Sequence, residues 1–97
     1  MLAYIGRQDY FDVMNSKHRQ TLIDIFAKPT SGTIEWARIE ALLVAVGCSV
    51  IEGSGSSVTF EKNGLRAYFH RPHPNKETLR YRVAAAREFL AQLEIKP

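Results

Sequence analysis

Residues 53–74 read GSGSSVTFEKNGLRAYFHRPHP, and this stretch decides the fold. Two runs of alternating apolar and polar residues, 57–62 and 65–70, flank the dipeptide Asn63-Gly64. Asn and Gly tolerate the positive φ values of a two-residue type I′ turn, so the pattern predicts a β-hairpin. Counting outward from the turn places residue 57 opposite residue 70.

The predicted hairpin has two different faces, because side chains alternate along a strand. Val58, Phe60 and Phe69 share one face, which requires a core. The other face is polar and is predicted to stay open. It carries three cross-strand pairs: Ser57 with His70, Thr59 with Tyr68, and the oppositely charged Glu61 with Arg66. We therefore expect function on this open face.

The rest of the chain predicts helices around a short additional strand. Apolar residues at helical spacing, with capping residues before them, indicate three helices. The expected elements are a helix Lys17–Ala27 capped by Asn15 or Ser16, a helix Ile34–Val46 capped by Thr33 and ended by Gly47, a strand Cys48–Glu52, and a helix Lys76–Leu93 capped by Asn75.

This order predicts an α+β, two-layer fold, α-α-β-β-β-α, whose three-stranded antiparallel sheet is covered on one face. The core of this order, α-β-β-β-α, is the one found in double-stranded-RNA-binding folds. Residues 1–13 have no clear period, and Met14 could be a second start. Residues 1–13 are therefore expected to be an N-terminal extension and residues 14–97 a single domain.

Composition narrows the class of protein. The 97 residues suffice for one small core, and no apolar run approaches the length of a membrane span. No signal peptide is recognised, and the single cysteine, Cys48, excludes an intrachain disulfide and is expected to be buried. We expect a cytoplasmic protein with no membrane contact and no cofactor.

Charge is distributed unevenly along the chain. Residues 62–97 hold eight Lys/Arg against three Asp/Glu, a net charge of +5, while the whole chain carries +3. A basic region of this kind suits nucleic acid. It also suits an acidic protein partner, and charge alone does not choose between the two.

The order and spacing of several short motifs between Lys17 and Leu93 resemble the HicA family of bacterial toxins. These are the helix ending in Gly47, Gly55-Ser56 before an alternating strand, a third strand, Pro72-His73 and a last helix. The resemblance implies a double-stranded-RNA-binding-like fold and an mRNA-cleaving ribonuclease (an mRNA interferase). It also implies silencing by a HicB-type antitoxin.

One position departs from the family pattern, which is Gly-Ser-His at the start of the second strand. Here Ser57 occupies the position of the catalytic histidine. RNA cleavage through the 2′-hydroxyl needs a base whose pKa lies near neutral pH, and a serine hydroxyl cannot serve. His70 is predicted directly opposite Ser57, so the hypothesis is that catalysis, without a metal ion, has moved across the hairpin to His70.

The remaining candidates would bind RNA. Arg66 and Arg71 would hold phosphate, and Tyr68 would stack on a base or bond a phosphate oxygen. The full set of RNA-binding candidates is Ser56, Arg66, Tyr68, Arg71, His73, Lys76 and Arg80. His70 and His73 alone are a weak signal for a metal site, and none is predicted.

Other interpretations stay open at this point. His70 could only cap exposed backbone, and Arg80 could lie on a solvated helix face. A non-catalytic module that binds RNA or the antitoxin fits the missing histidine. A basic interaction domain for an acidic protein is the third possibility.

Overall fold

The computed structural model describes residues 7–97, and within them it has helices α1 to α4 and strands β1 to β3. Their bounds are α1 Arg7–Val13, α2 Ser16–Phe26, α3 Trp36–Ala45, β1 Ser49–Glu52, β2 Ser57–Lys62, β3 Leu65–His70 and α4 Arg80–Gln92. The predicted α+β class is confirmed, as is the order α-α-β-β-β-α from α2 onward.

The sheet is an antiparallel meander with the order β1-β2-β3. Its hairpin register is as predicted, from Ser57 opposite His70 to Lys62 opposite Leu65. Asn63 and Gly64 have φ values of 54° and 80°, as the tight turn requires.

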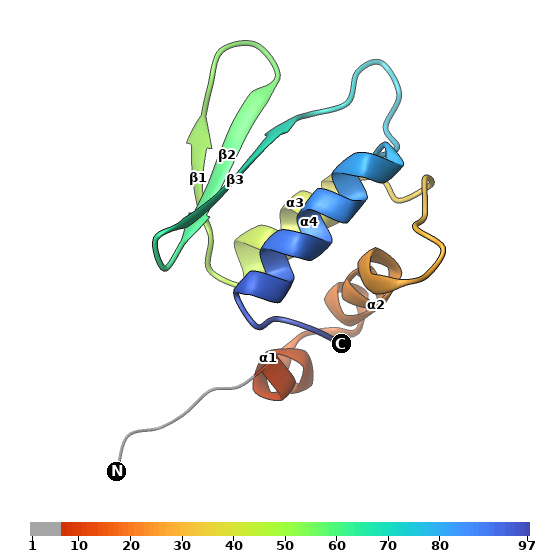
Figure 1. Cartoon of the computed structure of the whole chain (residues 1–97), viewed down its shortest axis with the longest axis vertical. Helices are drawn as coiled ribbons and strands as arrows, with labels where there is room; N and C mark the ends of the chain where they lie inside the picture. The colour runs from red at the N-terminus through yellow and green to blue at the C-terminus, as the bar shows by residue number, and fades with distance from the viewer. Residues whose placement is uncertain (1–6) are drawn as a thin grey trace.

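The helices cover one face of the sheet (Figure 1). α4 packs against β3, and α2 packs against both α3 and α4. On the covered face Phe60, Phe69 and Trp36 form an aromatic cluster with ring centroids 5.2–6.1 Å apart. Trp36 is buried, and so is Cys48, as predicted for the cysteine. No element of the described chain covers the other face, where Ile51 and Tyr68 are exposed.

Two helix ends follow the predicted chemistry. The Asn15 side chain accepts a hydrogen bond from the backbone N–H of His18 at 2.8 Å and caps α2. Gly47 follows α3 with φ 102°, and the N–H of Cys48 donates to the carbonyl of Leu43. This is a Schellman ending, which favours glycine. The predicted cap at Thr33 is wrong, because α3 starts after Glu35 and has no side-chain cap.

The predicted start of the last helix is also wrong. α4 begins at Arg80, and its N-cap residue is Leu79 rather than Asn75. The preceding residues form an extended bridge with the start of α3. Trp36 N–H donates to the Lys76 carbonyl at 2.9 Å, and Thr78 N–H donates to the Ile34 carbonyl at 2.8 Å. These backbone groups therefore pair over a long sequence distance and are not available for a helical turn.

Residues 1–6 of the expected N-terminal extension lie outside the described residues. Residues 7–13 form α1, a helix that the sequence pattern did not predict. Tyr10 and Phe11 are half-buried against the core, and Met14 is buried. Among the helices of residues 7–97, none is both long and apolar enough to cross a membrane.

Candidate functional site

The candidate site lies at the open end of the hairpin, where β2 begins and β3 ends. His70 is the last residue of β3 and is exposed. Its Nδ1 lies 3.4 Å from Ser56 Oγ, and its Nε2 lies 3.4 Å from the hydroxyl of Tyr68. The Tyr68 and His70 rings are 5.3 Å apart and nearly perpendicular. Both imidazole nitrogens therefore have a hydroxyl neighbour, and either hydroxyl can donate or accept.

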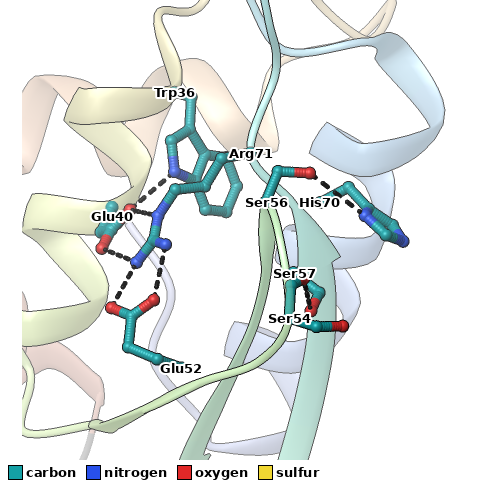
Figure 2. A network of polar contacts seen from close by, with 8 residues as sticks. All are labelled: Trp36, Glu40, Glu52, Ser54, Ser56, Ser57, His70 and Arg71. Atoms are coloured by element: carbon teal, nitrogen blue, oxygen red, sulfur yellow. Dashed lines mark hydrogen bonds and ion pairs between the residues drawn. The ribbon is translucent and has the colours of Figure 1, made fainter.

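Ser57 lies opposite His70 in the ladder but is not displayed on the open face. It is 5% exposed, and its Oγ donates to the carbonyl of Ser54 at 2.7 Å. A Cβ on Gly53 would collide with this hydroxyl, so the β1–β2 connection packs closely over it. The expectation that Ser57 presents its side chain beside His70 is therefore wrong, since the connection covers it. Ser56 contacts His70 instead (Figure 2).

Arg71 follows His70 and is bound by two carboxylates on the covered side of the sheet (Figure 2). Its Nε and Nη2 donate to Glu40 of α3, both at 2.9 Å. Its Nη1 and Nη2 donate to Glu52 of β1 at 2.8 and 3.0 Å. The Glu40 carboxylate also accepts a hydrogen bond from Trp36 Nε1 at 2.7 Å. Arg71 thus ties the end of β3 to α3 and β1.

The ionisation of this cluster follows from its geometry. Hydrogen bonds from Arg71 lower the pKa of Glu40, although partial burial opposes the shift. The same guanidinium lowers the pKa of the exposed Glu52. The two carboxylates in turn raise the pKa of Arg71, with Glu40 the larger cause. All three groups are therefore charged at neutral pH. The five donor positions of Arg71 are largely occupied, which leaves little for a phosphate.

Arg66 differs from Arg71 in its ion pairing. It lies opposite Glu61, as predicted, yet the two side chains form no ion pair in the described part of the chain. The carboxylate of Glu61 instead accepts a hydrogen bond from the N–H of Gly64 at 3.1 Å and so supports the turn. The predicted cross-strand pairing of Glu61 with Arg66 is therefore confirmed as a register, without an ion pair between the two side chains within residues 7–97. Arg66 is exposed.

The other RNA-binding candidates lie beyond β3. His73 and Lys76 are exposed and line a hollow of about 320 Å³ beside Trp36 and Arg71. Arg80 starts α4, and its Nε donates to the carbonyl of Thr30 at 3.1 Å. Arg80 therefore holds the loop between α2 and α3 and is not brought to the hairpin end.

Glu40 and Glu52 are the residues that sequence reasoning missed. They lie 31 and 19 positions from Arg71, and neither stands in a motif. The i, i+4 spacing of Trp36 and Glu40 on α3 was the only local signal. Within residues 7–97, no group of three or more His, Cys, Asp or Glu side chains is arranged to hold a metal ion.

Comparison with models of protein families identifies a family for most of the chain. Residues 36–95 match the family described as the HicA toxin of bacterial toxin–antitoxin. Comparison with curated proteins and with solved structures gives no match. The matched range runs from the first residue of α3 to the buried Ile95 after α4, and contains the whole sheet and the site. Since it covers more than half of the residues, the chain belongs to the HicA toxin family of bacterial toxin–antitoxin systems.

Proposed function

We propose that this chain binds mRNA on the open face of β3 and cleaves it with His70 as the catalytic residue. The observation that carries the proposal is the exposed imidazole of His70 between the hydroxyls of Ser56 and Tyr68. Arg66 lies on the same face of the same strand, as its ladder position requires, and its guanidinium forms no ion pair within residues 7–97. A base, two hydroxyl donors and a cation are the groups that this reaction needs.

The proposed reaction follows from these positions. The neutral imidazole of His70 accepts the proton of a ribose 2′-hydroxyl, and the 2′-oxygen attacks the adjacent phosphorus. The bond to the 5′-oxygen breaks, and that oxygen takes a proton from water. The Ser56 hydroxyl is the candidate for holding the scissile phosphate while negative charge builds up, and Arg66, about 13 Å along β3 from His70, is the candidate for holding the phosphate of a neighbouring nucleotide. The chemistry needs no metal ion.

The roles of the other candidates are proposed from their positions. Tyr68 is 64% exposed and stacks on a base next to the scissile phosphate. His73 and Lys76 extend the RNA contact beyond the hairpin. Arg71 and Arg80 are engaged by the protein itself rather than by the RNA: Arg71 fixes the end of β3, and Arg80 holds the loop between α2 and α3.

The test is cleavage of a mixed mRNA substrate by the purified chain, free of antitoxin, in EDTA. His70→Ala should abolish cleavage, and His18→Ala, which changes a histidine of α2, should not. Undiminished cleavage by His70→Ala would overturn the assignment of His70. The proposed partner that silences the activity is a HicB-type antitoxin, whose addition should stop it.

A second function is favoured by Ser57, which the resemblance to the family places at the position of its catalytic histidine. On this alternative the chain binds RNA or the antitoxin without cutting. Salt-sensitive RNA binding without cleavage by the wild-type chain would support it, because phosphate contacts give a steep dependence of affinity on salt.

A further inference from the structure

A groove lies between α4 and β3, and β3 is an edge strand of the sheet. Its volume is about 270 Å³. One wall is formed by Arg66, Ala67 and Tyr68 of β3, and the other by Ala85, Glu88 and Gln92 of α4. The buried side chains of Phe69 and Phe89 also line the groove, while Arg66, Tyr68, Glu88 and Gln92 are exposed.

The residues of α4 reach the groove because of their spacing. Positions 85, 88 and 92 lie on one face of an α-helix. Glu88 and Gln92 are exposed, and Glu88 forms no ion pair within residues 7–97. Arg66, across the groove, is also unpaired there. The groove therefore has an unpaired cation on one wall and an unpaired carboxylate with a neighbouring amide on the other.

The groove is continuous with the candidate catalytic site. Tyr68 lines the groove, and its hydroxyl lies 3.4 Å from His70 Nε2. A nucleotide whose phosphate lies near His70 can therefore place a neighbouring base along β3 toward Arg66. Tyr68 offers an aromatic ring to such a base, and Arg66 offers two donors to its phosphate.

We propose that this groove is a subsite for a single unpaired guanine of the RNA, an inference that rests on the proposed RNA binding. Guanine presents two adjacent donors, N1–H and N2–H, on its Watson–Crick edge. A carboxylate such as that of Glu88 accepts both at once. Adenine and cytosine present one exocyclic amine beside an acceptor nitrogen, and uracil presents one N–H between two carbonyl oxygens that repel a carboxylate. Single-stranded RNA is read through such edges.

Gln92 supports the same base. It lies one turn after Glu88, and its amide can donate to the O6 atom of guanine next to the N1–H. Glu88 therefore supplies the acceptor for the N1–H and N2–H groups, and Gln92 supplies the donor for the O6 atom, as the guanine edge requires. Glu88 and Gln92 are exposed, so each can be replaced without changing the buried Phe69 and Phe89, which also line the groove.

The test compares four five-nucleotide oligomers, UUGUU, UUAUU, UUCUU and UUUUU, in the 2′-O-methyl form, which cannot be cleaved through the 2′-oxygen. Fluorescence anisotropy with the full chain measures each affinity. We expect about tenfold tighter binding of UUGUU, the discrimination expected of one bidentate contact. Glu88→Gln should remove this preference and leave the affinity for UUUUU unchanged. Asp12→Asn, which removes one negative charge from α1, should leave the preference intact.

A second variant tests whether the groove must be open, rather than whether the Glu88 carboxylate is needed. Ala85→Leu fills the groove from the exposed face of α4 and should also remove the guanine preference. Equal affinities of the wild-type chain for all four oligomers would overturn the subsite and leave the proposed RNA binding standing. A preference that survives in both Glu88→Gln and Ala85→Leu would overturn it as well. Failure to bind any oligomer would overturn both proposals.

Discussion

His70 and Arg71 are consecutive residues whose side chains lie on opposite sides of the sheet (Figure 2). His70 contacts Ser56 and Tyr68 on the open face, while Arg71 binds Glu40 and Glu52 on the covered side. The N–H of Arg71 also donates to the carbonyl of Ser56 at 2.9 Å. The end of β3 is therefore fixed by Arg71 at the residue where the imidazole is presented.

Arg66 and not Arg71 should carry the salt dependence of RNA binding. Replacing Arg66 by Gln should weaken binding and reduce the slope of log affinity against log salt by about 1, since one phosphate contact is lost. The measurement is a salt titration of oligonucleotide binding. Lys17→Gln on α2 serves as the control and should leave the slope unchanged. An unchanged slope in Arg66→Gln would contradict the assignment.

A histidine at position 57, where the resemblance to the family places one, should destabilise the protein. Ser57 is nearly fully buried, and Gly53 packs directly against its hydroxyl. Ser57→His therefore adds a ring where there is no space, at a cost of about 1–3 kcal/mol in the free energy of unfolding. Urea denaturation measures the loss. Ser56→His, at the exposed neighbour, should cost much less. Equal stability of both variants would show that the connection rearranges freely.

The Arg71 cluster should make stability fall in acid. Glu40 and Glu52 have a pKa lowered from the ordinary 4.5 by their hydrogen bonds to Arg71. A carboxylate with a lowered folded-state pKa contributes stability above its unfolded pKa and loses it as pH falls through the folded value. The stability difference between wild type and Glu40→Gln should therefore be present at pH 7 and shrink below about pH 4.5.

Urea titrations at several pH values between 3 and 7 measure this difference. Glu77→Gln is the matched control, because Glu77 is exposed and forms no ion pair in the described chain. A Glu40→Gln difference that is as large at pH 3 as at pH 7 would mean that the ion pair with Arg71 does not stabilise the fold.

The end of α4 offers a stabilising substitution. Glu94 has φ 61°, and it occupies the C′ position of a Schellman motif, because Ile95 N–H donates to the Leu90 carbonyl at 2.9 Å. A side chain is strained in this conformation and glycine is not. Glu94→Gly should raise the free energy of unfolding by about 0.5–1 kcal/mol, measured by urea denaturation. Glu94→Ala keeps a Cβ and should bring no such gain.

The parts of the fold that were predictable are those decided by local chemistry. Asn63-Gly64 determined the turn and so the register of every pair in the hairpin, including Ser57 with His70. Asn15 and Gly47 marked helix ends through their own conformations and hydrogen bonds. In each case the residues that decide the structure are neighbours in the sequence.

The parts that were not predictable depend on distant contacts. The start of α4 was missed because Lys76 and Thr78 pair with backbone groups near residue 35, which no local pattern reveals. The role of Arg71 was missed for the same reason, since its partners come from α3 and β1. The burial of Ser57 depends on how the β1–β2 connection folds over it, and Gly53 alone did not indicate this.

The meander order of the sheet also has a consequence for folding. Neighbouring strands are consecutive in the chain, so β-ladder formation closes only short loops, and loop-closure entropy is small. The contact of α2 with α4 instead closes a loop that contains the whole sheet. Because local contacts form faster than distant ones, the hairpin that carries His70 is expected to form early, and docking of α2 onto α4 is expected to complete the native state.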